Sequence, residues 1–185
     1  MELSAHATEI LEGLKKVAQS SLDEAFTVPP AIYSDAEIAK LELARIFRAD
    51  WLCPGLAADI PNPGDYVTWN IAGQPIYCVR GRDGGIRSFA NVCLHRMMTL
   101  LQDRGNCQRI TCPYHGWTYD IDGRVIGAGH MQGRDPEFEK KGYRLPEIRT
   151  EIWEGWIYVT LNDEAPPVAE LLREKNDDPG VISAL

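Results

Sequence analysis

The sequence predicts a mainly β protein: an antiparallel β-sandwich that carries two ligand-bearing hairpin loops and is preceded by helices. Residues 1–50 place apolar side chains at helical spacing, whereas residues 51–165 consist of short runs of β-branched and aromatic residues separated by turns. Within this second region, two short segments that each contain a cysteine and a histidine fall between expected strands. The remaining residues, 166–185, are expected to form a C-terminal tail.

Residues 1–50 are expected to form a helical N-terminal extension. From Leu3 to Ser20, apolar residues recur on one face of a helix. Two prolines end this region. Ser34 and Glu37 then form a capping-box pattern, in which each side chain satisfies a free backbone donor at the start of a helix. This second helix is expected to end at about Arg48.

Seven strands are expected in residues 51–165, each bounded by turn residues. The alternation from Tyr66 to Ile71 fits a strand with one buried face, and Ala72-Gly73 fits the turn of a hairpin. The expected strands are 66–71, 76–80, 86–91, 109–112, 117–121, 124–126 and 152–161. A polar loop is expected at 127–141, and a short helix at 168–175.

The composition excludes some classes of protein. A formal net charge of -8 excludes a generally basic nucleic-acid-binding protein. No stretch approaches the ~18 apolar residues of a membrane span, and the first residues lack the pattern of a secretion signal. We therefore expect a cytoplasmic protein without nucleic-acid or membrane partners.

Two segments carry the candidate metal ligands, Cys93-Leu94-His95 and Cys112-Pro113-Tyr114-His115, and sixteen residues separate them. Two thiolates and two imidazoles suit either a tetrahedral zinc ion or a [2Fe-2S] cluster in which cysteines hold one iron and histidines the other. The single residue between Cys93 and His95 favours the cluster, because zinc sites more often begin with two cysteines separated by two to four residues. No catalytic residue is assigned.

Three further cysteines, Cys53, Cys78 and Cys107, are not part of these segments. An odd remainder argues against a disulfide framework and for a reducing compartment. We therefore expect these three residues to be packed thiols.

Arginines are concentrated around the first ligand segment. Between Arg80 and Arg109, six arginines stand against two aspartates, a formal charge of +4. This excess motivates the hypothesis that an acidic redox partner docks there, with a rate of electron delivery that falls as the salt concentration rises.

With Gly116 and Trp117 after His115, the whole string resembles the Rieske [2Fe-2S] signature, Cys-x-His and Cys-x-x-His across a loop of about this length. Met98 and Tyr114 stand where the high-potential Rieske proteins of respiratory chains carry two extra cysteines. The resemblance is therefore to the low-potential branch. This branch contains the Rieske ferredoxins and the alpha subunits of Rieske non-haem iron oxygenases of the aromatic-ring-hydroxylating type.

The resemblance implies a Rieske-type fold with four cluster ligands: Cys93, His95, Cys112 and His115. It also implies that Arg96 and Trp117 shield the cluster from water, and that the midpoint potential lies below zero. One departure is visible, because many family members have glycine where this chain has Met97.

The resemblance further implies a function in electron transfer. Family members take electrons from an NAD(P)H-dependent reductase or a ferredoxin and pass them to a mononuclear Fe(II), which activates O₂ for dioxygenation, monooxygenation or demethylation. That iron lies in a separate C-terminal domain, through which the family forms homotrimers. Because no histidine follows His130, we expect this chain to be the N-terminal part of such an oxidoreductase, with 166–185 beginning the linker.

Two alternatives remain open at this stage. One is a stand-alone Rieske ferredoxin-like electron carrier. The other is a zinc-stabilised binding module without a redox role.

Overall fold

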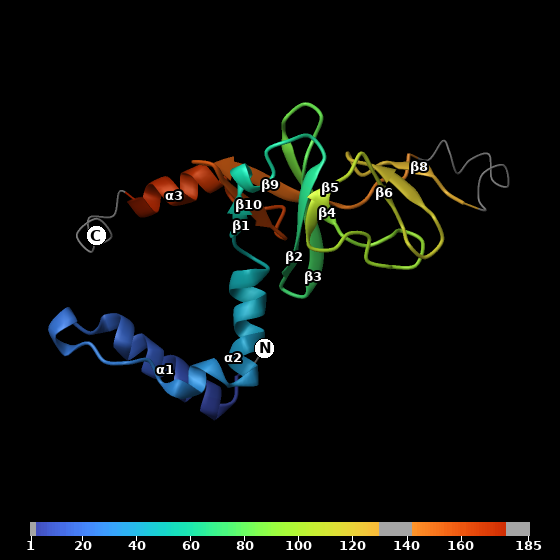
Figure 1. The fold of residues 1–185 in the computed structure, drawn as a ribbon. Helices are drawn as coiled ribbons and strands as arrows, with labels where there is room; N and C mark the ends of the chain where they lie inside the picture. Colours follow the sequence, from blue (N-terminus) through green and yellow to red (C-terminus); the bar gives the residue numbers. More distant parts are fainter. Residues whose placement is uncertain (1–2, 130–141, 177–185) are drawn as a thin grey trace. The chain divides into compact units, whose positions relative to one another are not determined.

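A computed structural model describes residues 3–129 and 142–176 of the chain (Figure 1). Most of the expected loop at 127–141 and the end of the expected tail therefore lie outside the described residues. The contacts divide the chain into two units, Met1–Arg48 and Ala49–Leu185. We call them the helical unit and the β-rich unit and describe each by itself.

The helical unit contains the two expected helices. Its elements in chain order are α1 (Ala5–Gln19), the 3₁₀ turns η1 (Leu22–Glu24) and η2 (Pro30–Tyr33), α2 (Ala36–Glu42) and a π-helical turn, η3 (Leu43–Phe47). The side chains of Ala7, Ile10 and Ile38 form its core, so the apolar stripe of α1 packs against α2.

The expected capping box at the start of α2 is wrong. Asp35 caps this helix, since its carboxylate accepts hydrogen bonds from the backbone N–H groups of Glu37 and Ile38, both at 2.9 Å. The Glu37 carboxylate instead accepts a hydrogen bond from the hydroxyl of Ser4 at 2.5 Å. Ser34 instead ends the preceding turn η2, where its N–H donates to the carbonyl of Ala31 at 3.1 Å.

The β-rich unit consists of two antiparallel sheets in the part of the chain that the structure describes (Figure 1). The seven-stranded sheet has the order β1-β10-β9-β4-β3-β2-β5, and the three-stranded sheet has the order β6-β7-β8. The strands are β1 (Leu52–Leu56), β2 (Asp65–Ile71), β3 (Gln74–Arg80), β4 (Ile86–Ala90), β5 (Arg104–Asn106), β6 (Arg109–Thr111), β7 (Thr118–Asp120), β8 (Val125–Gly127), β9 (Glu147–Trp153) and β10 (Trp156–Thr160). The predicted mainly β fold with N-terminal helices is thus confirmed.

One of the seven expected strands is wrong. The run at 152–161 is not a single strand, because the chain reverses at Glu154-Gly155 and separates β9 from β10. Both turn residues have positive φ, 48° and 80°, as the two-residue turn of a tight hairpin requires. The short strands β1 and β5 were not expected either. β1 contains Pro54 and an irregular register, and β5 pairs with β2 over only three residues.

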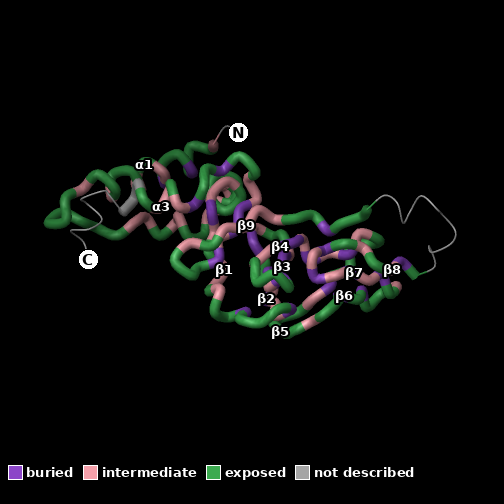
Figure 2. Tube along the Cα trace, turned by 90° about the horizontal axis from the view of Figure 1, so that it is seen from above, coloured by how far each residue is buried: buried purple, intermediate pink, exposed green. Residues whose placement is uncertain are grey.

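Side chains from both sheets share one of the hydrophobic clusters of the β-rich unit, and buried stretches, in purple, lie along its strands in Figure 2. Tyr77 and Phe89 enter this core from the large sheet and Tyr119 from the small one. Cys93 and Cys112 belong to the same core. The packing of the two sheets therefore fixes where both candidate cysteine ligands lie.

Two short helical elements complete the described part of the β-rich unit. A 3₁₀ turn, η4 (Ala57–Asp59), follows β1, and α3 (Val168–Asn176) occupies the position of the expected C-terminal helix. The carboxylate of Glu151 on β9 accepts a hydrogen bond from the N–H of Val168 at 2.9 Å and so caps the start of α3. Among the described residues, no helix combines the length and the apolar character that crossing a bilayer requires.

Candidate metal centre

Two loops with the same backbone pattern carry the candidate ligands. In the first loop, Cys93 N–H donates to the carbonyl of Met98 at 2.8 Å, and its carbonyl accepts from Met97 N–H at 2.9 Å. In the second, Cys112 N–H donates to the carbonyl of Trp117 at 2.7 Å, and its carbonyl accepts from Gly116 N–H at 3.1 Å. Each loop is therefore closed by the same pair of hydrogen bonds, counted from its cysteine.

The fifth residue of each loop has a left-handed backbone. Gly116 has φ 71° and Met97 has φ 56°. Glycine adopts this conformation without steric cost, whereas a residue with a Cβ does so at a cost of about 1–2 kcal/mol. The departure from the family's glycine at Met97 thus leaves the loop hydrogen bonds unchanged but places a strained residue beside the candidate ligands.

The two thiols lie inside the protein. Cys93 is 1% exposed and Cys112 is 3% exposed. The phenolic oxygen of Tyr119 lies 3.2 Å from Cys93 Sγ and accepts a hydrogen bond from Leu94 N–H at 3.0 Å. Burial, followed by the hydrogen bond with Cys93, raises the pKa of Tyr119, so the phenol stays protonated and can donate its proton toward the sulfur.

The sequence interpretation missed Tyr119. The signal was present, since alternation along Trp117, Thr118 and Tyr119 points the two aromatic residues to the same face of the strand. Both aromatic side chains are buried in the core that holds the thiols.

The imidazole rings of the two loops lie close together. The rings of His95 and His115 lie 4.7 Å apart between centroids, at 70° to one another. His95 is exposed and His115 is half-buried, with its Nδ1 shielded from solvent. The structure therefore brings an imidazole pair together at the surface, while the thiols of the same two loops lie in the core.

Aromatic rings cover the imidazoles. Trp117 stacks on His95 with a centroid distance of 5.3 Å and an interplanar angle of 4°. Tyr114 lies 3.8 Å from the His115 ring. Arg96 is exposed next to His95, and among the described residues its side chain makes no hydrogen bond or ion pair. Trp117 is thus in position to fix the plane of His95, whereas Arg96 points its charge into solvent.

The arginines between Arg80 and Arg109 do not all surround the first ligand loop. Arg80 turns inward and donates hydrogen bonds to the carbonyl oxygens of Ala57 and Ile60, both at 2.7 Å. Arg87 is at the start of β4, at the opposite end of that strand from the loop. The structure therefore corrects the hypothesis of one basic docking surface around this loop.

The three other cysteines are free thiols. Cys78 is buried and accepts a hydrogen bond from the Ser88 hydroxyl at 3.0 Å, and burial raises the pKa of its thiol to about 11. Cys107 is half-buried. Cys53 is exposed, so the expectation of a packed thiol is wrong there.

The arrangement of donors fits a two-metal cluster. Within residues 3–129 and 142–176, no group of three or more His, Cys, Asp or Glu side chains is placed to hold one metal ion. The donors instead form a buried thiol side and a surface imidazole side, which is how a [2Fe-2S] cluster with two different irons is held. This donor set is compatible with an iron–sulfur centre.

Comparisons with known proteins give the family. The pattern of the Rieske [2Fe-2S] domain matches residues 50–143. The chain belongs to the Rieske [2Fe-2S] domain family, as its motif predicted.

The relatives are oxygenase subunits. The chain is 34% identical over 153 residues to the glycine betaine monooxygenase oxygenase subunit of Pseudomonas aeruginosa, covering 82% of this chain and 35% of the relative. It is 35% identical over 158 residues to the chlorobenzene dioxygenase subunit alpha of Cupriavidus sp., covering 84% of this chain and 35% of the relative. The chain thus spans about a third of the length of these curated relatives.

A solved structure agrees with the fold. Naphthalene 1,2-dioxygenase from Rhodococcus sp. superposes with a TM-score of 0.77 at 30% identity, over 92% of this chain and 39% of the other. The predicted Rieske [2Fe-2S] cofactor and the resemblance to Rieske oxygenase alpha subunits are therefore confirmed.

Proposed function

We propose that Cys93 and Cys112 hold one iron of the [2Fe-2S] cluster and that His95 and His115 hold the other. The observation that carries this proposal is the pair of equally closed loops, which bury both thiols and bring both imidazoles together. When bound, the cluster supplies a one-electron redox centre.

The residues around the ligands have distinct roles in this proposal. The two buried thiols exclude water from the inner side of the cluster. His95, exposed at the surface, gives electrons their entry and exit. Tyr119 donates a hydrogen bond to Cys93 Sγ and thereby stabilises negative charge on the sulfur. Trp117 shields one face of His95 and keeps its plane fixed.

The chain is a Rieske electron-transfer domain of the kind found in oxygenase subunits. We propose that it receives electrons from an NAD(P)H-dependent reductase or a ferredoxin, and that they pass to a mononuclear Fe(II) site in a catalytic domain outside these 185 residues. In this proposal residues 1–50 are a helical extension, 51–165 the Rieske domain and 166–185 the connection to the catalytic domain, through which homotrimers form.

The proposal does not include a substrate. A glycine betaine monooxygenase and a chlorobenzene dioxygenase match this chain at 34% and 35% identity, although their names give chemically different substrates. The matched part therefore does not distinguish between substrates. Because Cys53, Cys78 and Cys107 are free thiols, we further propose a reducing compartment such as the cytoplasm.

The proposal is tested by the metal content and the reduced-state EPR spectrum of protein purified without oxygen. We expect iron and acid-labile sulfide in equal amounts, and an EPR spectrum that changes or disappears when His95 or His115 is replaced by alanine. His6→Ala is the matched control, because His6 is an exposed histidine of the helical unit, and it should leave the spectrum unchanged. Stoichiometric zinc without sulfide, or an unchanged spectrum in both ligand variants, would contradict the proposal.

A further inference from the structure

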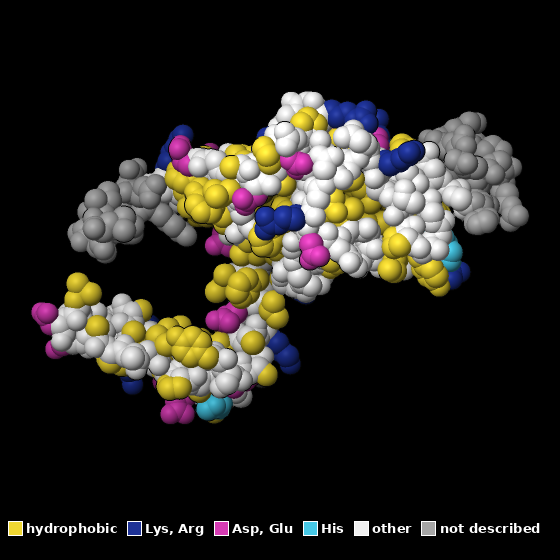
Figure 3. Space-filling model, in the orientation of Figure 1, with side chains coloured by type: hydrophobic (Ala, Val, Ile, Leu, Met, Phe, Trp, Pro, Cys, Tyr) yellow, Lys and Arg dark blue, Asp and Glu magenta, His cyan; other side chains and the backbone are white. Residues whose placement is uncertain are grey.

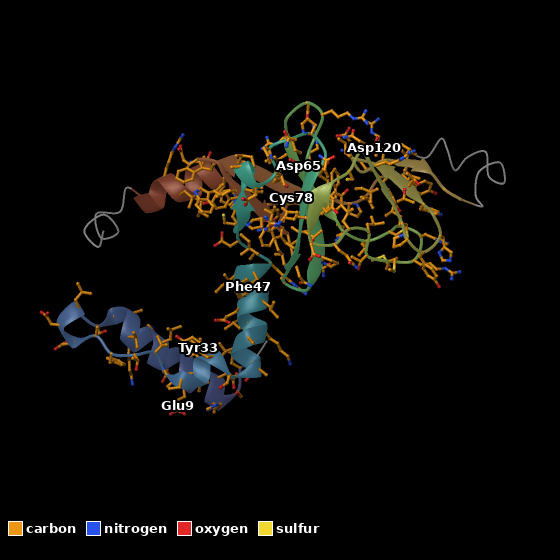
Figure 4. All side chains as sticks on the ribbon, in the orientation of Figure 1. Glu9, Tyr33, Phe47, Asp65, Cys78 and Asp120 are labelled. Atoms are coloured by element: carbon orange, nitrogen blue, oxygen red, sulfur yellow. The ribbon has the colours of Figure 1, made fainter. Side chains whose placement is uncertain are left out.

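Four arginine side chains line a recess of about 280 Å³ that is separate from the candidate metal centre. The lining residues are Arg82, Asp83, Arg87, Asp122, Arg124 and Arg144. They come from the β3–β4 turn and the start of β4, from the β7–β8 turn and from the segment before β9. Figure 4 shows nitrogen-bearing side chains near Asp120, at the end of β7 that leads into its turn with β8. The ligand loop lies at the other end of β7.

Two of the four guanidinium groups are held in place. Arg87 donates to both carboxylate oxygens of Asp83, at 3.0 and 2.5 Å, and lies 3.8 Å from Asp122 Oδ1. Arg144 donates through Nε to the carbonyl of Asp122 at 2.9 Å and lies over the ring of Phe89 at 5.6 Å. Because their side chains are already ordered, a bound anion would take little further conformational entropy from them.

The other two guanidinium groups are uncommitted. Arg82 and Arg124 are exposed, and within the described part of the chain their side chains make no hydrogen bond or ion pair. Dark blue Lys and Arg side chains are visible at the upper edge of the β-rich unit in Figure 3. The recess therefore offers donors that no described partner uses.

The charge of the recess is opposite to that of the whole chain. Four arginines against two aspartates give its lining a formal +2, although the chain as a whole carries -8. The hydrogen bonds from Arg87 hold the pKa of Asp83 well below its usual range, so this carboxylate remains charged at neutral pH. Glu147 lies beyond the lining, 3.6 Å from Arg144. The local excess is small and confined to one concavity, which suits a compact anion better than an extended nucleic acid.

We propose that this recess binds a doubly charged oxyanion of the phosphate type, as free phosphate or as the phosphate group of a phosphorylated side chain. A dianion neutralises the formal +2 of the lining. The planar guanidinium groups of Arg82 and Arg124 can each donate two parallel hydrogen bonds to phosphate oxygens, a geometry that monovalent chloride cannot use. The proposal does not depend on the function proposed for the cluster.

Isothermal titration calorimetry on the cluster-loaded protein tests the proposal, with inorganic phosphate and O-phosphoserine as probes at fixed ionic strength. We expect saturable binding that is weakened at least tenfold in the double variant Arg82→Gln/Arg124→Gln. The double variant Arg45→Gln/Arg173→Gln removes the same charge from exposed sites outside the recess and should bind like the unchanged protein. Tighter binding of one probe identifies the source of the phosphate group.

Three results would overturn the proposal. The first is no saturable binding of either probe. The second is equal weakening in the two double variants, which would show a general charge effect. The third is equally tight binding of succinate, a dianion without phosphate geometry. The absorption spectrum of the cluster, recorded in parallel, shows that each variant is folded and loaded.

Discussion

Replacing Tyr119 by phenylalanine should lower the midpoint potential of the cluster. The substitution removes the hydroxyl that lies 3.2 Å from Cys93 Sγ and keeps the ring that packs in the core. A hydrogen bond to a charged acceptor contributes about 1.5–3 kcal/mol, and it is stronger when the sulfur carries more negative charge, as it does after reduction. If about 1–1.5 kcal/mol of this is specific to the reduced state, the potential falls by roughly 40–60 mV, since 1.4 kcal/mol corresponds to 59 mV for one electron.

The matched control for this variant is Tyr77→Phe. Tyr77 is buried in the same core, and its hydroxyl has no hydrogen-bond partner among the described residues. Its removal should leave the potential unchanged and raise the free energy of unfolding by about 1 kcal/mol, because an unsatisfied buried hydroxyl is lost. Tyr119→Phe, in contrast, should also destabilise the fold by about 1–3 kcal/mol, since the N–H of Leu94 loses its acceptor.

A redox titration followed by circular dichroism or EPR measures both variants. A Tyr119→Phe potential equal to or higher than that of the unchanged protein would refute the proposed hydrogen bond to Cys93. An equal shift in both variants would show that general packing, and not the hydrogen bond, sets the potential.

Three further predictions follow from the geometry. Gly116→Met should lower the free energy of unfolding by about 1–2 kcal/mol, because it places a side chain at a left-handed position. Met97→Gly adds no such strain and should leave the free energy of unfolding unchanged or raise it by at most about 1 kcal/mol. Chemical denaturation measures both variants, and an equal loss of stability in the two would contradict this reasoning. Burial raises the pKa of Cys78 above that of an unfolded thiol, so stability should be complete below about pH 9 and fall by up to ~3 kcal/mol as the pH rises to about 11. Urea denaturation between about pH 9 and pH 11 should show a smaller loss of stability in Cys78→Ala than in the unchanged protein. An identical loss in both would show that Cys78 does not cause it. Although the arginines as a group do not surround the first ligand loop, Arg96 is exposed beside His95. Reduction by an acidic ferredoxin should therefore slow as the salt concentration rises, and Arg96→Gln should weaken this dependence while the exposed Arg173→Gln does not. Stopped-flow rates with equal salt dependence in both variants would show that the charge of Arg96 does not act on the ferredoxin.

The sequence predicted those parts of the fold whose signal is local. The strand from Tyr66 to Ile71 alternates cleanly, and the structure contains β2 there. The turn at Glu154-Gly155 was missed although a charged residue and a glycine interrupt the run there, because Ile152 to Leu161 was interpreted as one continuous strand through them.

The residues of the candidate site also differ in whether their signal is local in the sequence or depends on tertiary contacts. Cys93, His95, Cys112 and His115 could be singled out because four metal-binding residues at fixed spacing form a local signal. The hydrogen bond from Tyr119 to Cys93 joins residues 26 positions apart and depends on how the two sheets pack. The inward turn of Arg80 toward backbone carbonyls also depends on tertiary contacts, and a count of charges along the chain does not contain it.

The most direct test of the central claim is electron–nuclear double resonance on the reduced protein with ¹⁵N-labelled histidine. Because His95 and His115 are proposed to hold the same iron of the cluster, the spectrum should contain two distinct ¹⁵N couplings, and a protein with only its other two histidines labelled would show neither. A spectrum without coupled histidine nitrogen would contradict the claim that this chain holds its cluster by a cysteine pair and a histidine pair.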